Sequence, residues 1–208
     1  KHPESLLYGQ DVGGRLGGVF REAATLAQKF GKERVFNTPI QEAYIVGSTV
    51  GMSCVGLKPI VEIQFLGFTQ NCFHQICQQI ARSRFRTRGS QPAQITIRSP
   101  FGGNVKTPEF HSDSMESMFA QTSGLKVVMP SSAYDARGLL LEAIRDPDPV
   151  MFFEPLRGYR LQSDEVPDED YTVPFGKLRT VREGDDVTIV TWSASVPVVE
   201  AAAATLAE

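Results

Sequence analysis

Short apolar segments alternate with helical patterns along most of this 208-residue chain. Segments that are apolar throughout and end in turn residues predict buried strands of a parallel sheet with helices on both faces. An opening strand and loop are predicted within Leu6–Gly14, and the strands that follow are Arg34–Phe36, Pro59–Phe65, Gln94–Arg98, Leu125–Met129 and Val150–Phe153. The predicted fold class is therefore α/β, with a mostly parallel sheet covered by helices on both faces.

Helical periodicity fills the gaps between these strands. An apolar residue at every fourth position predicts a helix from about Gly67 to Arg86, and another helix follows the turn at Pro130. Near the end of the chain, Val187–Trp192 is predicted to be a buried strand, and a helix is predicted from about Ser195. One strand and one helix cannot close a core, so we expect this part to begin a second α/β domain. The predicted divisions are a first domain at 1–161, an acidic linker at 162–183 and the start of the second domain at 184–208.

Glu42 is the single carboxylate at the start of a helix that otherwise carries no charge as far as Leu57. Gly47 and Gly51 of this helix let another backbone approach closely. We therefore expect a buried acid, which must be paired or protonated and is a candidate for proton chemistry. The alternative interpretation is an acid at a helix N-terminus, favoured by the helix dipole, with Thr38 as the cap.

Charge and cysteine content narrow the functional classes. A net charge of -3 gives no electrostatic reason to expect nucleic acid or an anionic membrane as a partner. The four arginines between positions 82 and 88 suggest a phosphate patch, but the solvated end of a helix is favoured because Gly89 follows. Cys54, Cys72 and Cys77 lack CxxC spacing, so we expect core thiols in a reducing compartment.

Eight sequence blocks, in order, cover nearly the whole chain and are more specific than any single glycine motif. They are GQDVGG (9–14), GGVFR (17–21), VFNTPIQEAYIVG (35–47), GLKPIVEIQF (56–65), ITIRSPFGG (95–103), HSDS (111–114), GLKVVMPSSAYDARGLLLEAIRDPDPVMFFEP (124–155) and GDDVTIVTWSASV (184–196). In these blocks the chain resembles the β subunit of the thiamine-diphosphate-dependent component of 2-oxo acid dehydrogenase complexes, of the branched-chain and pyruvate dehydrogenase type. The resemblance implies a transketolase-like pyrimidine-binding domain, followed by the start of a transketolase C-terminal-like domain.

The resemblance also implies a cofactor site shared between subunits. In this family thiamine diphosphate lies between two chains: the α-type partner holds the diphosphate through Mg²⁺, and the β-type domain holds the aminopyrimidine. The present chain has no GDG followed at the expected distance by asparagine, which is the family's metal and diphosphate signature. We therefore expect it to be inactive alone. The expected partners are an α-type subunit or fused α-type segment, a second β subunit and a lipoyl acyltransferase core, with no nucleic acid and no membrane.

Residue roles follow from positions that match the family. Glu42 matches the glutamate that shares a proton with a pyrimidine nitrogen, so that the imino tautomer forms and can remove the thiazolium C2 proton. Ile40, Gln64 and Phe68 match positions that line the pyrimidine pocket, although core packing is the alternative for Ile40 and Phe68. His111 matches the histidine that faces the thiazolium and the arriving lipoyl group; the alternative is a solvent-facing loop histidine.

A cation site is a further implication of the resemblance. Asp146 and Asp148, with carbonyl groups near Ile95, match a loop where some relatives hold K⁺, and oxygen ligands suit such a hard cation. The alternative is a capped helix end with a turn. Asp113 replaces the glutamine that usually follows His-Ser in this family, and an acid there would alter the basicity of His111 or the choice of substrate.

The function implied is that of the pyrimidine-binding half of a 2-oxo acid dehydrogenase, an oxidoreductase that decarboxylates a 2-oxo acid and transfers the acyl group to a lipoyl domain. The implied location is the cytoplasm, or the mitochondrial matrix in a eukaryote. Three alternatives within the enzyme class are acetoin dehydrogenase, transketolase and deoxyxylulose-phosphate synthase. An alternative of another class is a non-catalytic docking subunit, against which the presence of both Glu42 and His111 argues.

Overall fold

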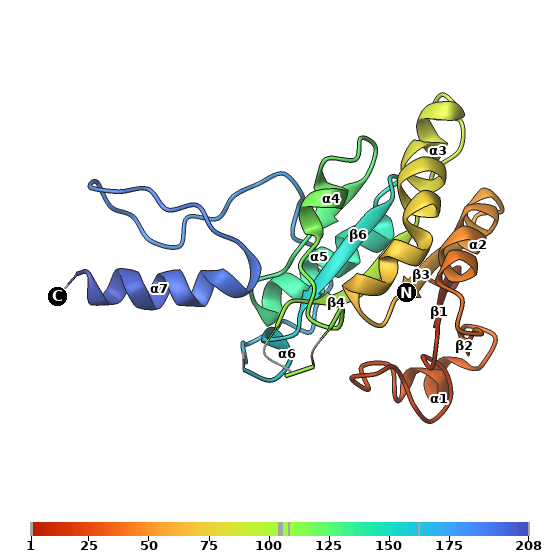
Figure 1. Cartoon of the computed structure of the whole chain (residues 1–208), viewed down its shortest axis with the longest axis horizontal. Coiled ribbons are helices and arrows are strands. Elements are labelled where there is room, and N and C mark those ends of the chain that lie inside the picture. Colours follow the sequence, from red (N-terminus) through yellow and green to blue (C-terminus); the bar gives the residue numbers. More distant parts are fainter. Residues whose placement is uncertain (1, 104–105, 108, 162, 208) are drawn as a thin grey trace.

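A single parallel sheet organises the computed structural model, which describes residues 2–103, 106–107, 109–161 and 163–207. The strand order is β2-β1-β3-β4-β6-β5, and every pairing in this sheet is parallel (Figure 1). The strands are β1 (Ser5–Gly9), β2 (Val35–Asn37), β3 (Lys58–Glu62), β4 (Thr96–Phe101), β5 (Lys126–Val128) and β6 (Val150–Pro155). The α/β fold and each of the first six predicted strands are therefore confirmed, with shifts of a few residues at their ends.

Helices connect these strands. The α-helices are α1 (Leu26–Phe30), α2 (Glu42–Cys54), α3 (Ala81–Arg86), α4 (Glu116–Ala120), α5 (Ala133–Arg145), α6 (Gly158–Leu161) and α7 (Val196–Thr205). The described residues also form two 3-10 helices, η1 (Leu66–Cys72) and η3 (Ser193–Ser195), and one π-helix, η2 (Gln75–Ile80). The helix predicted from Gly67 to Arg86 is thus a helical run of three geometries, η1, η2 and α3. No helix in the described part of the chain is long and apolar enough to cross a membrane.

Alternate residues of β1 and β6 enter different cores, as a sheet covered on both faces requires. Tyr8 and Met151 belong to the largest core, which α2, the η1–η2 run and α4 cover. Their neighbours Leu7 and Val150 point the other way, into two smaller cores that are covered by α1 and α5 respectively. The uninterrupted apolar runs of the sequence follow from this two-sided burial.

The strand order reverses direction between β1 and β3. From β1 the chain moves outward to β2 by way of α1, and then returns past β1 to β3 by way of α2 on the opposite face. Connections that leave two neighbouring strands on opposite faces open a crevice at their carboxyl ends, where ligands bind in sheets of this type. Gln64, just beyond β3, spans this point because its Nε2 donates to the carbonyl of Gln10, just beyond β1, over 3.4 Å.

The predicted buried strand at Val187–Trp192 is wrong. The segment has no strand conformation, and Val187 and Trp192 are 71% and 59% exposed. No described strand pairs with it, and an isolated strand is not stable in water. The helix predicted from about Ser195 is confirmed as α7, with Pro197 in its first turn. The division into domains at 161 and 184 stays a prediction.

The aromatic centre of the largest core should dominate stability. Phe153 is fully buried between Phe101 and Phe119, with ring centroids 6.1 and 5.7 Å away. We expect Phe153→Ala to lower the free energy of unfolding in urea by about 3–5 kcal/mol, because it removes buried surface and leaves a cavity. Phe85→Ala, at a ring that is 86% exposed, is the matched control and should change it by less than about 0.5 kcal/mol. Equal losses for the two variants would contradict this description of the core.

Candidate functional site at the carboxyl edge of the sheet

Glu42 is the first residue of α2, at the edge of the sheet where the strands end. Its carboxylate is half-buried, and Asn71 Nδ2 donates to Oε2 over 3.4 Å. The acid was predicted to be buried but is only partly so, because the first turn of α2 lies at the rim: Ile40 and Tyr44 beside it are 73% and 57% exposed. Thr38 is not the cap either, since Gln41 takes that position and the Thr38 hydroxyl donates to the Pro39 carbonyl.

The 3-10 helix η1 links Glu42 to His111. Phe68 of η1 contacts the His111 ring edge-on, with centroids 5.3 Å apart, and Phe65 just before η1 does the same at 4.6 Å. Asn71, three residues after Phe68, holds Glu42. Side chains three residues apart eclipse each other on a 3-10 helix, so Phe68 and Asn71 share one face. The two acid–base candidates therefore flank the same face of one short helix.

The loop around His111 is held close to η1. Its imidazole Nδ1 lies 2.8 Å from the carbonyl oxygen of Glu109, to which the His111 backbone N–H also donates. Because a carbonyl oxygen only accepts, this contact selects the neutral tautomer with the proton on Nδ1 and leaves Nε2 as an acceptor. The loop approaches so closely that a Cβ on Gly67 would overlap the Phe110 carbonyl oxygen. Glycine is thus required at position 67.

The structure brings together some of the predicted residues and not others. Glu42, Phe68 and His111 are joined through η1, and Gln64 lies at the reversal of strand order. Ile40 is mostly exposed on the loop before α2 and makes none of these contacts. The Asp113 carboxylate lies beside Gly67. The His111 imidazole bonds the backbone carbonyl of Glu109 instead.

Asp146 and Asp148 lie at the opposite edge of the sheet, where β5 and β6 begin. Lys126 Nζ lies 2.7 Å from each Asp146 oxygen and 3.2 Å from Asp148, and Arg84 Nη1 lies 2.6 Å from Asp148. Burial opposes ionisation of Asp148, but Arg84 and Lys126 lower its pKa below the usual value. The Ile95 carbonyl accepts the Val150 N–H over 2.9 Å. The described residues contain no group of three or more His, Cys, Asp or Glu side chains suited to a metal, and the K⁺ site stays a prediction.

Comparison with known proteins assigns the family. Residues 1–162 match the model of the transketolase pyrimidine-binding domain. The chain belongs to this family. The chain is 49% identical over 191 residues to the pyruvate dehydrogenase E1 component subunit beta of Staphylococcus aureus (strain Mu50), and 48% identical to that of Staphylococcus epidermidis (strain RP62A). In both cases 92% of this chain aligns with 58% of the relative, so the chain spans less than two thirds of these proteins.

A solved structure supports the same fold. A chain described as "Split gene transketolase, inactive beta4 tetramer" matches with a TM-score of 0.76, covering 98% of this chain and 60% of that one. The sequence identity is 22%, so this likeness concerns the fold alone. The predicted resemblance to a transketolase-like pyrimidine-binding domain is confirmed by the family match and by this structure.

Sequence reasoning missed a buried charge cluster below the carboxyl edge of this pyrimidine-binding domain. Arg98 of β4 forms a two-pronged ion pair with Glu154 of β6, with N–O distances of 2.5 and 3.0 Å, and its Nη1 lies 3.6 Å from Glu62 of β3. The Tyr159 hydroxyl also donates to Glu154. The available signal was a charged residue within each of three apolar strands, since charges are buried only when they are paired.

Glu62 is the least satisfied member of this cluster. It is 2% exposed, and its Oε2 accepts no hydrogen bond among the described residues. Burial raises the pKa of Glu62 to about 9; a hydrogen bond with Glu22 and repulsion from Glu22 and Glu154 add to this, and Arg98 opposes it. Glu62 is therefore protonated at neutral pH in the folded protein. This leaves one negative charge fewer beneath the site.

The pH dependence of stability should report Glu62. Its folded pKa of about 9 lies above the ordinary value of 4.5, so the stability it contributes is complete below pH 4.5 and is lost as the pH rises towards 9. Across that window the folded state binds one proton more, and the free energy of unfolding should fall by about 1.4 kcal/mol per pH unit from this group.

Urea unfolding at several pH values between 5 and 9 tests this. We expect Glu62→Gln to remove the contribution of Glu62 to the slope of the free energy of unfolding against pH. Glu4→Gln is the matched control, because the Glu4 carboxyl is half-buried and its pKa of about 2 in the folded protein lies below this range. Identical slopes for wild type and Glu62→Gln would show that Glu62 is ionised in the folded protein.

Proposed function

We propose that this chain is the pyrimidine-binding half of a thiamine-diphosphate-dependent 2-oxo acid dehydrogenase, which decarboxylates a 2-oxo acid and transfers the acyl group to a lipoyl domain. The observation that carries the proposal is the placement of Glu42 and His111 on one face of η1, at the strand-order reversal where such sheets bind ligands. The identity of 49% to pyruvate dehydrogenase E1 subunit beta supports the same reaction class.

The residues at this edge fit the pyrimidine part of thiamine diphosphate. The hydrogen bond of Glu42 uses Oε2, and Oε1 accepts none from the described residues, so it is available to a ring nitrogen. Phe68 supplies a flat apolar surface, and the Gln64 amide adds a polar group at the reversal point. Thiamine diphosphate supplies a nucleophilic carbon that permits decarboxylation of a 2-oxo acid. Ile40, which is exposed here, would contact the cofactor or the partner subunit in the assembled enzyme.

Glu42 and His111 would move protons at different points. A carboxylate both accepts and donates, so Glu42 can hold a proton at a pyrimidine nitrogen and take it back, with Asn71 fixing its other oxygen. The orientation of His111 leaves Nε2 as an acceptor when neutral and as a donor when protonated. Such a group can deliver a proton to an incoming acceptor, here the sulfur of a lipoyl group.

The remaining parts of the proposal concern the assembly. An α-type subunit or fused α-type segment would hold the diphosphate and Mg²⁺, a second β subunit would pair with this one, and a lipoyl acyltransferase core would receive the acyl group. The domain division at 161 and 184, a K⁺ ion near Ile95, Asp146 and Asp148, and a cytoplasmic location belong to the same proposal. On this basis the chain alone should lack decarboxylase activity.

Glu42→Gln tests the cofactor-activating role. In the enzyme reconstituted with its α-type partner, we expect the variant to slow deuterium exchange at C2 of thiamine diphosphate by about 100-fold or more, because glutamine cannot relay a proton. Exchange is followed by proton NMR after acid quench. Glu116→Gln is the matched control, since Glu116 is also a half-buried acid at the first position of a helix, α4, and it should leave the rate unchanged. An unchanged rate in Glu42→Gln would make Glu42 a helix-end acid only.

His111→Ala tests the lipoyl step. We expect acyl transfer to a lipoyl domain to fall at least about tenfold more than decarboxylation measured with an artificial electron acceptor, because only the first reaction needs a proton delivered to sulfur. His74→Ala is the control and should affect neither rate, because His74 is an exposed histidine between η1 and η2 whose imidazole contacts Gln79 and not Phe65 or Phe68. Equal losses in both assays would indicate an earlier role such as binding of the oxo acid, and no loss would return His111 to a solvent-facing residue.

A further inference from the structure

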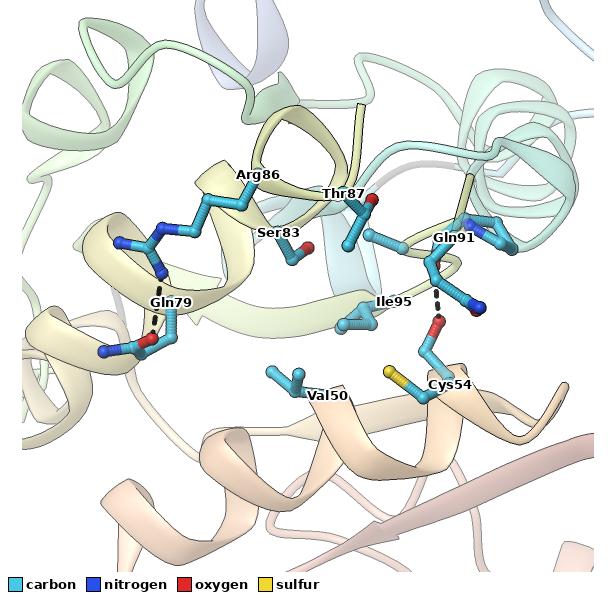
Figure 2. Close-up of a pocket in the computed structure, with 11 residues that line it drawn as sticks. Val50, Cys54, Gln79, Ser83, Arg86, Thr87, Gln91 and Ile95 are labelled. Carbon is cyan, nitrogen blue, oxygen red and sulfur yellow. Dashed lines mark hydrogen bonds between the residues drawn. The ribbon is translucent and has the colours of Figure 1, made fainter. Parts of the chain in front are cut away.

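Figure 2 shows a cavity of about 210 Å³. It lies away from Glu42, at the edge of the sheet where the strands begin. Its walls come from the second half of α2, from the helical run η2–α3 and from the segment that leads into β4. Glu42 and Cys54 mark the two ends of α2, whose 13 residues span about 20 Å. The cavity is therefore separate from the carboxyl edge.

The base of this cavity is apolar and fixed. Ile95 and Ala93 are 1% and 2% exposed, and Val50 of α2 faces them across the cavity (Figure 2). Ser53 Oγ donates to the Pro92 carbonyl over 3.3 Å, which ties α2 to the segment before β4. Two walls are thus held in place without a ligand.

The rim carries a cation without an acidic partner. Arg86 Nη1 donates to Gln79 Oε1 over 3.1 Å, and no carboxylate of the described residues forms an ion pair with Arg86. Arg84, two residues earlier, is by contrast paired with Asp148. A guanidinium has five N–H donors, so most of those on Arg86 remain for a ligand. Gln79, which orients it, belongs to the π-helix η2, a geometry that occurs mostly as single turns at functional sites.

We propose that this cavity is a second binding site, for a small monocarboxylic acid with an aliphatic body. The carboxylate would pair with Arg86, and the aliphatic body would cover Val50 and Ile95. The volume is about seven times the ~30 Å³ share of one water molecule and lies below the ~300 Å³ at which pockets for drug-sized ligands begin. A chain of about six carbons suits it. This site is independent of the proposed reaction.

Cys54 provides a direct readout of occupancy. Its thiol lines the cavity and is exposed, whereas Cys72 and Cys77 are 0% and 4% exposed. Burial, with additional repulsion from Glu42 and Cys77, raises the pKa of Cys72 to about 12, so that thiol does not compete. Alkylation of the folded protein by iodoacetamide, followed by peptide mass spectrometry, therefore measures access to the cavity at Cys54.

Hexanoate is the probe, and hexanamide of the same size is its neutral control. We expect saturating hexanoate to slow alkylation of Cys54 at least fivefold, and hexanamide at the same concentration to slow it less than twofold. Arg86→Gln should abolish the protection by hexanoate. Arg82→Gln is the matched control, because Arg82 lies exposed on the same helix without lining the cavity, and it should keep the protection.

A second variant is designed to fill the cavity with a larger side chain. Val50→Phe keeps Arg86 and should also lose the protection, with far-UV circular dichroism confirming that the variant folds. No slowing in the wild-type protein would overturn the proposal, as would equal slowing by hexanamide or persistence of protection in Arg86→Gln. These measurements need no catalytic turnover, so their outcome does not depend on the role of Glu42 or His111.

Discussion

The reversal of strand order between β1 and β3 is the constraint from which the candidate site follows. It sends α1 and α2 to opposite faces of the sheet, and the contact of Gln64 with Gln10 bridges the crevice left at the strand ends. The first residue of α2 therefore emerges beside this crevice, and η1 after β3 lies next to it. Chain topology therefore fixes where the candidate site lies, and the side chains at that edge then determine its proton chemistry.

Below that edge the sheet contains charges that an apolar core would ordinarily exclude. Arg98 lies between Glu62 and Glu154, so one cation serves two carboxyl groups and a protonated Glu62 reduces the imbalance. Buried pairs of this kind add little net stability, because desolvation offsets their attraction, but breaking one leaves an uncompensated charge. The cluster joins β3, β4 and β6, and the segments that follow these strands carry Phe65, His111 and Tyr159.

The sequence was sufficient for the strands and for the family, because two-sided burial produces uninterrupted apolar runs and the eight blocks preserve their order. The sequence was insufficient where burial or pairing depends on residues that are distant in the chain but close in the fold. The Val187–Trp192 run is as apolar as β6, yet it is exposed because no strand of the described residues pairs with it. Glu42 looked buried because its own helix is uncharged, but exposure at the rim is set by neighbours such as Tyr44. The pairing of Arg98 with Glu154 joins residues 56 positions apart, which no local pattern reveals.

The π-helix η2 has a consequence for how the chain tolerates changes in length. A wide turn holds one residue more than an α-helical turn, so it stores that residue without disturbing the helix on either side. One residue fewer between Gln75 and Ile80 would leave Phe68 in place and rotate every later side chain by about 100°. Arg84 would then face away from Asp148, and Arg86 would leave the rim of the cavity. One additional residue in η2 thus keeps the side chains of η1 and α3 in their observed relative orientation.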